Sequence, residues 1–581
     1  MVLNTGIPKT PLYAAFFCAA IMSACSVDHP GQAQEVSQCP APSTSIATVQ
    51  GKAKESPILG QQVTVQGIVT LVQNGHGLYI EETGSDSDER TSNAVFVQTG
   101  SAATGVEIGS LISASGKVSE IGKGRYLLTA ITEVDGLSTC ATDQPLPLTD
   151  IALPLKGPGR EALEGMRVRI DDSLVVTDVY QFNRGNITLS GNGLQTVPTE
   201  VVKPGQNAAD LLADNRAFAL PVELPENLDL PAMLVSGMAV NDVIGVVAHD
   251  GRGLRVSLQS ISVKPVTDLT PPAAPATGVF RIVGMNLHNY FNGDGNGRGF
   301  PTPRGAETLD EFIKQRDRIG AAIKILSPHM LAVMELENDG FGPESAAKDF
   351  IQLANEASQK PWAVTRPGGD DIGNDKISVA IFYRSDLLKA LGPARTLTGP
   401  EFKRSRQPLA QIFQPIPDGE KFVVVINHLK SKGSCPDTGE NADQKDGQGC
   451  WNPIRLASAE KMSAWAGEIA TSAGTENILI LGDMNAYRNE DPIAAIRDAG
   501  FTELMDKNAG QVYSFVFYGQ HGSLDYAFAS PALLDNVQQA FIWNVNAAFP
   551  ANMDFPQPWL RFSDHDPVVV DIRVRHSSTS D

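Results

Sequence analysis

The sequence has little that favours a polyanion-binding surface, a zinc site or a membrane-spanning helix. Of its 581 residues, 46 are Lys or Arg and 66 are Asp or Glu, which gives a net charge of −20. A nucleic-acid-binding protein usually carries a basic surplus instead. The six cysteines form no Cys-x-x-Cys or Cys/His spacing typical of zinc. The apolar run from Leu12 to Met22 is too short to cross a membrane as a helix.

That apolar run predicts an export signal in residues 1–33. Lys9 precedes the run, which ends in Met22-Ser23-Ala24-Cys25-Ser26. Small residues before a cysteine are typical of a bacterial lipobox, so Cys25 is the predicted lipidation site and outer-membrane anchor. Cleavage near Gly31 to Ala33 is the alternative and gives a freely secreted protein. In both cases we expect an extracellular protein or a surface lipoprotein, outside the cytoplasm, where disulfides persist.

Four cysteines remain beyond the signal, and their positions predict two disulfides. Cys39 and Cys140 bracket one candidate domain, whereas Cys435 and Cys450 bracket one short loop. We therefore predict the pairs Cys39–Cys140 and Cys435–Cys450. On the chain-entropy account, closing the second loop stabilises the fold by about 3 kcal/mol.

Residues 39–145 predict a small β-barrel of the OB type. Five short alternating runs with glycines at the corners favour such a barrel. The runs are 62–70, 77–81, 94–97, 111–118 and 126–128. OB barrels often bind single-stranded nucleic acid, but this segment has few of the basic and aromatic residues that such binding needs. A structural or positioning module is the alternative, and we expect catalysis to lie wholly in residues 279–581.

Residues 146–269 continue as a β-rich domain without a catalytic constellation, and the Pro- and Ala-rich stretch 270–278 predicts a linker. From residue 279 to 581, strands alternate with helices, which is typical of an α/β domain. One predicted helix covers residues 308–326, where apolar side chains recur on one face.

Several strands of this last domain end in oxygen-bearing side chains. Predicted strands reach Asn286, Glu335 and Asp483, and Asn485 follows two residues after Asp483. Carboxylate and amide oxygens suit a hard divalent cation, and the amide of Asn485 suits a phosphoryl oxygen. Gly482 lets the backbone turn before this pair. Taken alone, Gly-Asp-x-Asn is also ordinary turn chemistry.

Two of the nine histidines lie beside these polar strand ends. His428 ends the apolar run 422–427, and His565 follows Asp564 just before the last predicted strand. Each histidine alone could be structural. Asp525 lies inside an apolar strand, where a buried carboxylate needs a partner, and a histidine that must be oriented is a natural one.

In order along the chain, these motifs resemble those of the endonuclease/exonuclease/phosphatase superfamily, which includes pancreatic deoxyribonuclease. Further segments are similar to the ExeM/NucH-type extracellular deoxyribonucleases, which also carry an OB-like module. Those segments are 298–306, 334–340, 428–433 and 446–452. The resemblance implies an α+β chain: a two-sheet α/β sandwich of the DNase I type, preceded by the barrel and the further β-rich segment.

The resemblance also implies roles for individual residues. Asn286, Glu335 and Asp564 would hold Mg²⁺ or Mn²⁺, with Ca²⁺ as a further candidate. His565, oriented by Asp525, would take the proton of an attacking water. The remaining implied roles are these: Asp483 positions the water or binds a second metal, Asn485 donates to phosphoryl oxygens, and His428 stabilises the transition state or protonates the leaving alkoxide.

A basic groove is expected from Lys403, Arg404, Arg406, Lys430 and Lys432, with Arg384 and Lys430 clamping neighbouring phosphates. The resemblance thus predicts a metal-dependent nuclease acting on DNA, with RNA left open, for nutrient or phosphate scavenging or extracellular DNA degradation. No obligate protein partner is expected. A phosphatase or phospholipid phosphodiesterase on the same fold is one alternative, and a surface-binding protein without catalysis is another.

Overall fold

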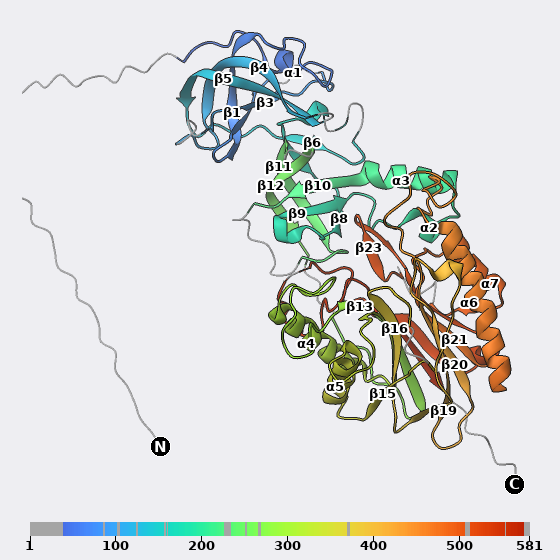
Figure 1. The fold of residues 1–581 in the computed structure, drawn as a ribbon. Coiled ribbons are helices and arrows are strands. Elements are labelled where there is room, and N and C mark those ends of the chain that lie inside the picture. Colours follow the sequence, from blue (N-terminus) through green and yellow to red (C-terminus); the bar gives the residue numbers. More distant parts are fainter. Residues whose placement is uncertain are drawn as a thin grey trace, which may run out of the picture.

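The computed structural model describes residues 39–573 with short gaps at 85–87, 101–104, 124–125, 156–158, 160, 226–233, 250–252, 265–268, 369–371, 506–511 and 552. The predicted export signal and Cys25 lie outside the described residues. Figure 1 shows a barrel at one end, a middle sheet next to it and a larger sandwich at the other end. No helix in the described part of the chain is both long and apolar enough to cross a membrane.

The first unit is a closed five-stranded barrel with strand order β1-β2-β3-β5-β4, in which β1 also pairs with β4. Its strands cover the five predicted runs. They are β1 (Gln62–Gln73), β2 (Gly77–Glu81), β3 (Ala94–Val97), β4 (Leu111–Lys123) and β5 (Tyr126–Ala141), with α1 (Ile46–Gln50). The barrel is confirmed, while its assignment to the OB class stays a prediction. Cys39 and Cys140 are bonded, with their Cα atoms 5.4 Å apart.

The middle unit is a seven-stranded sheet of order β12-β10-β9-β8-β11-β7-β6. Its elements are β6 (Thr149–Ile151), β7 (Arg167–Ile170), β8 (Leu174–Asp178), β9 (Asn186–Ser190), α2 (Pro198–Val201), α3 (Gln206–Phe218), β10 (Ala219–Glu223), β11 (Ala239–His249) and β12 (Leu254–Val263). Its apolar side chains share one continuous core cluster with the sandwich. The middle unit is therefore packed onto the sandwich and does not hang from a free linker.

Two sheets face each other in the sandwich. The first has the order β15-β16-β14-β13-β27-β26 and the second β17-β19-β20-β21-β25-β22, with β18 beside β19. The strands of the first are β13 (Val279–Tyr290), β14 (Met330–Glu337), β15 (Trp362–Val364), β16 (Ile377–Arg384), β26 (Val537–Ile542) and β27 (Val568–Arg573). The strands of the second are β17 (Leu388–Ala390), β18 (Arg395–Thr396), β19 (Leu409–Pro415), β20 (Phe422–His428), β21 (Ile478–Asp483), β22 (Thr502–Glu503) and β25 (Asp525–Ala529).

Helices cover the outer faces of both sheets, on opposite sides of the sandwich (Figure 1). α4 (Leu309–Leu326) and α5 (Ala346–Ser358) cover the first sheet, and α6 (Asn452–Ala473) and α7 (Asp491–Asp498) cover the second; α8 (Pro531–Leu534) is a short turn. α4 confirms the predicted helix, and its capping box between Thr308 and Glu311 fixes where it begins. Between the sheets, β-branched and aromatic side chains form a buried core. The predicted two-sheet sandwich is thus the observed architecture.

A buried carboxyl group joins the barrel to the middle unit. Glu164 is 2% exposed, and its Oε1 accepts hydrogen bonds from Gln50 Nε2 at 3.2 Å and from the Thr129 amide at 3.1 Å. Burial disfavours the charged form and raises the pKa of Glu164 from 4.5 to about 8, in spite of the bond from Gln50. At neutral pH this carboxyl group is mainly protonated.

We expect the stability of this junction to depend on pH through Glu164. Above pH 4.5 the unfolded chain loses the proton that the folded chain keeps until about pH 8, so this group's contribution falls across that window. Glu164→Gln keeps the acceptor oxygen and cannot ionise. The variant should match the natural chain in melting temperature at pH 4 and exceed it at pH 8. Equal melting temperatures at both values would contradict the protonated carboxyl.

Candidate active site

The strand register brings the predicted polar residues to one edge of the sandwich. β20 and β21 are parallel, and His428 pairs with Asp483 in register. β25 runs antiparallel to β21, so Asp525 lies opposite Asp483. The first sheet contributes Glu335 from the end of β14. Because each apolar run stops at this edge, its terminal polar side chain faces the same space.

The strands that carry these residues are irregular where they reach the edge. β-bulges occur in β13 after Asn286 and in β14 around Glu335, and Glu335 has φ of 62°. His288 and Asn485 also have positive φ, at 53° and 48°. Such backbone costs energy and is typical of functional sites. The bulges turn these side chains from the core toward the edge.

Gly482 is required by a close approach between the two central strands. Its φ is 145°, and a Cβ atom there would lie 2.1 Å from the carbonyl oxygen of Asn427. Asn427 itself is buried and donates from Nδ2 to the Leu481 carbonyl at 2.8 Å. A side chain at position 482 would therefore push β21 away from β20 and separate Asp483 from His428.

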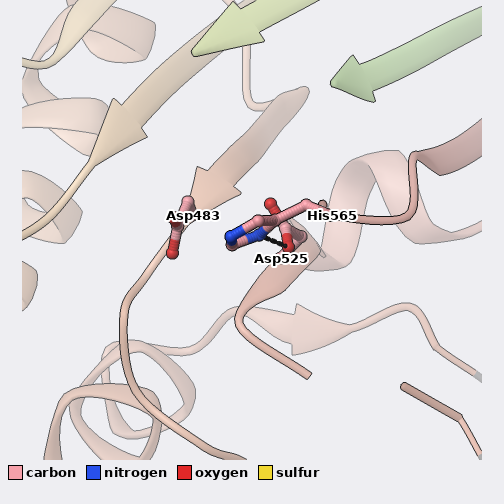
Figure 2. A group of neighbouring side chains, drawn as sticks. All are labelled: Asp483, Asp525 and His565. Atoms are coloured by element: carbon pink, nitrogen blue, oxygen red, sulfur yellow. Dashed lines mark hydrogen bonds and ion pairs between the residues drawn. The ribbon is translucent and has the colours of Figure 1, made fainter. Parts of the chain in front are cut away.

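His565 and Asp525 form a hydrogen-bonded pair, as the sequence predicted (Figure 2). The distance from His565 Nδ1 to Asp525 Oδ2 is 2.7 Å, and both side chains are buried. Burial lowers the pKa of His565, but Asp525 at this bond, with Asp564 and Asp483 nearby, outweighs burial and raises it well above its ordinary value. The pair fixes the ring, so that Nε2 is directed away from Asp525.

Ser514 holds the carboxylate of this pair and was missed by sequence reasoning. Its Oγ donates to Asp525 Oδ2 at 2.7 Å and accepts from the amides of Leu524 and Asp525, both at 3.0 Å. A serine gives no sequence signal for this role, because it lies eleven residues from Asp525 in a loop. The loop before His565 is held in a similar way by Asn546, whose Nδ2 donates to the His565 carbonyl at 2.7 Å.

His428 links the two sheets at the site. Its Nε2 lies 3.3 Å from Asp483 Oδ2 and 4.0 Å from Glu335 Oε1. Burial, together with the positive charge of Arg406, lowers the pKa of His428 well below its ordinary value, so the ring is neutral at pH 7. Burial and the neighbouring Asp525 raise the pKa of Asp483 to about 7. At pH 7 a neutral His428 therefore lies beside an Asp483 that is only partly ionised.

Asp483, Asp525 and His565 form a candidate acidic/His metal site among the described residues, with one potential ligand atom of each within 4.8 Å of the others. Figure 2 shows the three side chains converging from separate segments. This group differs from the predicted ligand set, of which Asp564 lies beside His288, 3.9 Å from Oδ2 to Nε2. His288, His565 and Arg561 outweigh burial and lower the pKa of Asp564 to about 2. His288 was not predicted.

Several buried polar atoms at this edge have no hydrogen-bond partner within the described chain. They are Asn286 Nδ2, His428 Nδ1, Asp525 Oδ1 and Arg406 Nε. Buried groups of this kind are rare, and an absent ligand or ion is a common reason for them. Asn485 is better satisfied, since its Nδ2 donates to the Leu429 carbonyl at 3.1 Å and its amide to Asp483 at 2.8 Å.

The expected basic groove is only partly present. Arg406 is 7% exposed and donates to the Leu429 carbonyl, and it lies near enough to Asp483 and Glu335 to interact with both. Lys430 and Arg404 lie over the ring of Trp451, each 5.2 Å from its centre. Burial and the surrounding arginines lower the pKa of Lys430 to about 8.

The structure pairs two of the predicted phosphate-binding residues with carboxylates and places one of them, Arg384, away from the site. Arg384 follows Tyr383, which pairs with Met330 at the start of β14, so it lies at the sheet end opposite Glu335. Its guanidinium bonds Asp386 at 2.7 and 2.6 Å. Lys432 is held by Glu490, with Nζ 2.6 Å from both carboxylate oxygens. Each of these two cations is therefore engaged by a carboxylate in the structure.

The disulfide Cys435–Cys450 is present as predicted, with Cα atoms 5.5 Å apart. It joins the loop after His428 to the start of α6. Trp451, next to Cys450, donates from Nε1 to the Gly433 carbonyl at 3.1 Å. The bond therefore anchors the loop that carries Lys430.

The middle unit contacts the backbone that carries the site. Glu200, 9% exposed, accepts from the Ser523 amide at 3.1 Å and lies 3.4 Å from Arg488 Nε. Ser523 is two residues before Asp525. His521 exchanges backbone hydrogen bonds with Gln195 and Val197 at 2.8 and 2.9 Å. The predicted catalytic side chains follow residue 279, but part of their backbone support does not.

No protein-family model matches the chain, and no curated protein matches it. Solved structures match about half of it: an endonuclease/exonuclease/phosphatase protein of Bacteroides vulgatus covers 51% of this chain and 99% of its own, with 17% identity and a TM-score of 0.35. The human Nocturnin catalytic domain with bound sulfate covers 52% and 96%, with 16% identity and a TM-score of 0.35. A mannosyl-6-phosphatase of Bacteroides thetaiotaomicron covers 50% and 98%, with 16% identity and a TM-score of 0.33. Because these scores lie below 0.5, the roles below are argued from this chain's own residues.

Ser514→Ala should lower kcat for phosphodiester hydrolysis about tenfold with little change in KM, because Asp525 Oδ2 loses one of its two side-chain donors. The lost donor also makes Asp525 more basic, so the part of the pH–rate profile that reports His565 should move to higher pH. Ser463→Ala is the matched control, since Ser463 is buried on α6 and bonds only the Ala459 carbonyl. An unchanged pH–rate profile in the Ser514→Ala variant would show that Ser514 does not position Asp525.

Proposed function

We propose that this protein is an exported, metal-dependent nuclease of the endonuclease/exonuclease/phosphatase type that hydrolyses phosphodiester bonds in DNA, with RNA left open. The observation that carries the proposal is the row of Glu335, His428, Asp483, His565 and Asp525 at one sandwich edge, of which all but the partly exposed Glu335 are buried. The order of the motifs along the chain supports the same assignment.

His565 is the proposed proton acceptor for the attacking water. Asp525 and Ser514 fix the ring, so Nε2 is the atom that can face a water molecule. The ring must be neutral to accept this proton; the carboxylates around it favour the imidazolium, and a divalent cation at this edge would oppose their charge and favour the neutral ring. After the proton moves, Asp525 stabilises the imidazolium. Asp483, close to both rings, is placed to orient the water.

His428 is proposed to stabilise charge on the phosphoryl oxygens. Its pKa is lowered by burial, so the ring is neutral and donates a hydrogen bond without first gaining a proton. This environment favours transition-state stabilisation over protonation of the leaving alkoxide, the two roles that the sequence left open, and the leaving alkoxide would then take its proton from solvent water. Arg406, buried beside the site, adds a fixed positive charge.

The residues of this edge fit a divalent cation. Glu335 and Asp483 bring hard oxygen atoms from both sheets, and Asn286 Oδ1, which accepts from the His288 amide at 2.9 Å, has a second lone pair that suits a cation. We propose that Asn286, Glu335 and Asp564 hold Mg²⁺ or Mn²⁺, with Ca²⁺ as a further candidate. Such an ion offsets the negative charge of the carboxylates and of the phosphodiester.

The cellular setting is proposed from the sequence and the disulfides. Two bonded cysteine pairs are typical of proteins outside the cytoplasm. With the predicted signal, they support a secreted protein or an outer-membrane lipoprotein anchored through Cys25. Degradation of extracellular DNA for nutrients or phosphate fits this setting. The barrel, if it is of the OB class, would position the enzyme on its substrate.

One digestion experiment tests the proposed function. The purified full chain is incubated with circular plasmid, linear plasmid and RNA, with EDTA and then with Mg²⁺ or Mn²⁺ in excess. We expect cleavage of DNA that EDTA abolishes and metal restores. Full activity in EDTA, or no cleavage of any nucleic acid with metal present, would contradict the proposal.

A catalytic variant provides the control for a contaminating nuclease. His565→Ala should lower the rate about 10²–10⁴-fold if this ring transfers the proton. Arg384→Ala is the comparison, because Arg384 lies at the far end of the sheet and should leave the rate unchanged. Loss of activity in both variants, or in neither, would show that His565 has been assigned wrongly.

A further inference from the structure

A cavity of about 580 Å³ lies between the middle unit and the sandwich. Its walls come from the ends of β8 and β9 on one side and from the hairpin of β23 (Phe515–Phe517) and β24 (Gln520–Gly522) on the other. Figure 1 shows β23 next to the middle sheet. The volume falls within the range of about 300–1,000 Å³ that is typical of sites for small ligands.

Exposed aromatic rings gather at this cavity. Tyr180, Phe517 and Tyr518 are 75%, 54% and 81% exposed, and all three line it. In the described part of the chain, they are the large aromatic side chains that stand more than half exposed. Such rings are normally buried, so three of them at one cavity indicate a surface that a ligand covers.

The cavity borders on the catalytic cluster. Asp564, next to His565, is one of its lining residues. The ring of Phe515 lies against the His565 ring, with centres 4.5 Å apart, and Phe515 stacks on Phe517 with centres 6.4 Å apart. A row of rings therefore leads from the reacting edge into the cavity. A group bound there would lie near the reacting edge.

Both walls of the cavity are held in place. Thr177, at the end of β8, donates through Oγ1 to the carbonyl of Gly519 in the hairpin turn. A Cβ atom at Gly519 would lie 3.1 Å from Asp178 Cβ, which shows how closely the turn approaches β8. This contact holds the hairpin and the middle unit against each other, so the two walls that carry the rings are joined at one end of the cavity.

Polar groups among the rings suit the edges of a heterocycle. Asn186, Thr188 and Arg255 line the middle-unit wall, and Arg561 lies on the sandwich side. Arg255 donates to Asn186 Oδ1, so the two side chains form a polar wall. Amide, hydroxyl and guanidinium groups bond the edges of nucleobases, and such a wall suits a heterocycle better than a lipid chain. Bases inside a duplex have both faces covered by their neighbours, so exposed protein rings can stack only on unpaired bases.

We propose that this cavity binds an unpaired nucleobase next to the scissile phosphodiester, stacked on Tyr180 and on Phe517 or Tyr518. The preferred substrate is then single-stranded or frayed nucleic acid, and the middle unit is part of the substrate site. This inference rests on the proposed nuclease function and adds the substrate class to it.

The test compares two oligomers of equal length that differ only in their bases. One is a single-stranded oligonucleotide, and the other is an oligomer of stable abasic residues with the same phosphodiesters. The full chain should cleave the first with a kcat/KM about five- to a hundredfold higher, the range expected from one stacked base. The triple variant Tyr180→Ala/Phe517→Ala/Tyr518→Ala, which removes all three exposed rings, should cleave both oligomers equally.

Two further variants make the result specific. Tyr180→Phe/Tyr518→Phe keeps the rings and should keep the preference, while Ile416→Ala changes an exposed apolar side chain that is 45% exposed and does not line the cavity. Equal melting temperatures confirm that the variants fold. A natural chain without preference, an Ala variant that retains it, or a Phe variant that loses it would overturn the inference.

The two proposals can fail separately. Cleavage of both oligomers with equal efficiency by the natural chain leaves the nuclease function intact and overturns the stacking site. No cleavage of any nucleic acid overturns the nuclease function, and the stacking site with it.

Discussion

The hydrogen bond between His565 Nδ1 and Asp525 Oδ2 is the interaction on which the site depends. His565 lies in the loop before β27 of the first sheet, and Asp525 begins β25 of the second sheet, so the bond forms only when the two sheets are packed together. Its strength comes from burial, because a carboxylate removed from water interacts more strongly with its partner. Two side chains hold this pair in place: Ser514 donates to the carboxylate of Asp525, and Asn546 donates to the backbone carbonyl of His565.

The division of the chain into a catalytic part and accessory parts is less sharp than the sequence suggests. The middle unit shares a core with the sandwich, and Glu200 holds the backbone two residues before Asp525. It also forms one wall of the cavity that reaches Asp564. A protein with a net charge of −20 has little long-range attraction for a polyanion. Short-range stacking and a bound cation are ways to offset that repulsion.

The sequence predicted the barrel strands, the sandwich and the convergence of polar strand ends, because apolar runs that stop at a polar residue have a direct structural meaning. It did not predict Ser514 or Glu200, since a hydroxyl in a loop and a carboxylate in another unit acquire their roles only through the fold. Lys432 and Arg384 were predicted to bind phosphate because the sequence reveals that a residue is positively charged, but it does not reveal which carboxylate pairs with that residue in the fold. Glu490, 58 residues from Lys432, could not be paired with it from sequence; Asp386, two residues from Arg384, could have been.

The central claim is that this edge of the sandwich directs a water molecule at phosphorus. Cleavage of a defined oligonucleotide in water enriched in ¹⁸O, followed by mass spectrometry of the products, tests it most directly. We predict one heavy oxygen on the newly formed terminal phosphate for each bond cut, in full-length protein with metal present. Products without heavy oxygen on that phosphate would contradict the account, since the oxygen would then have come from elsewhere than the attacking water.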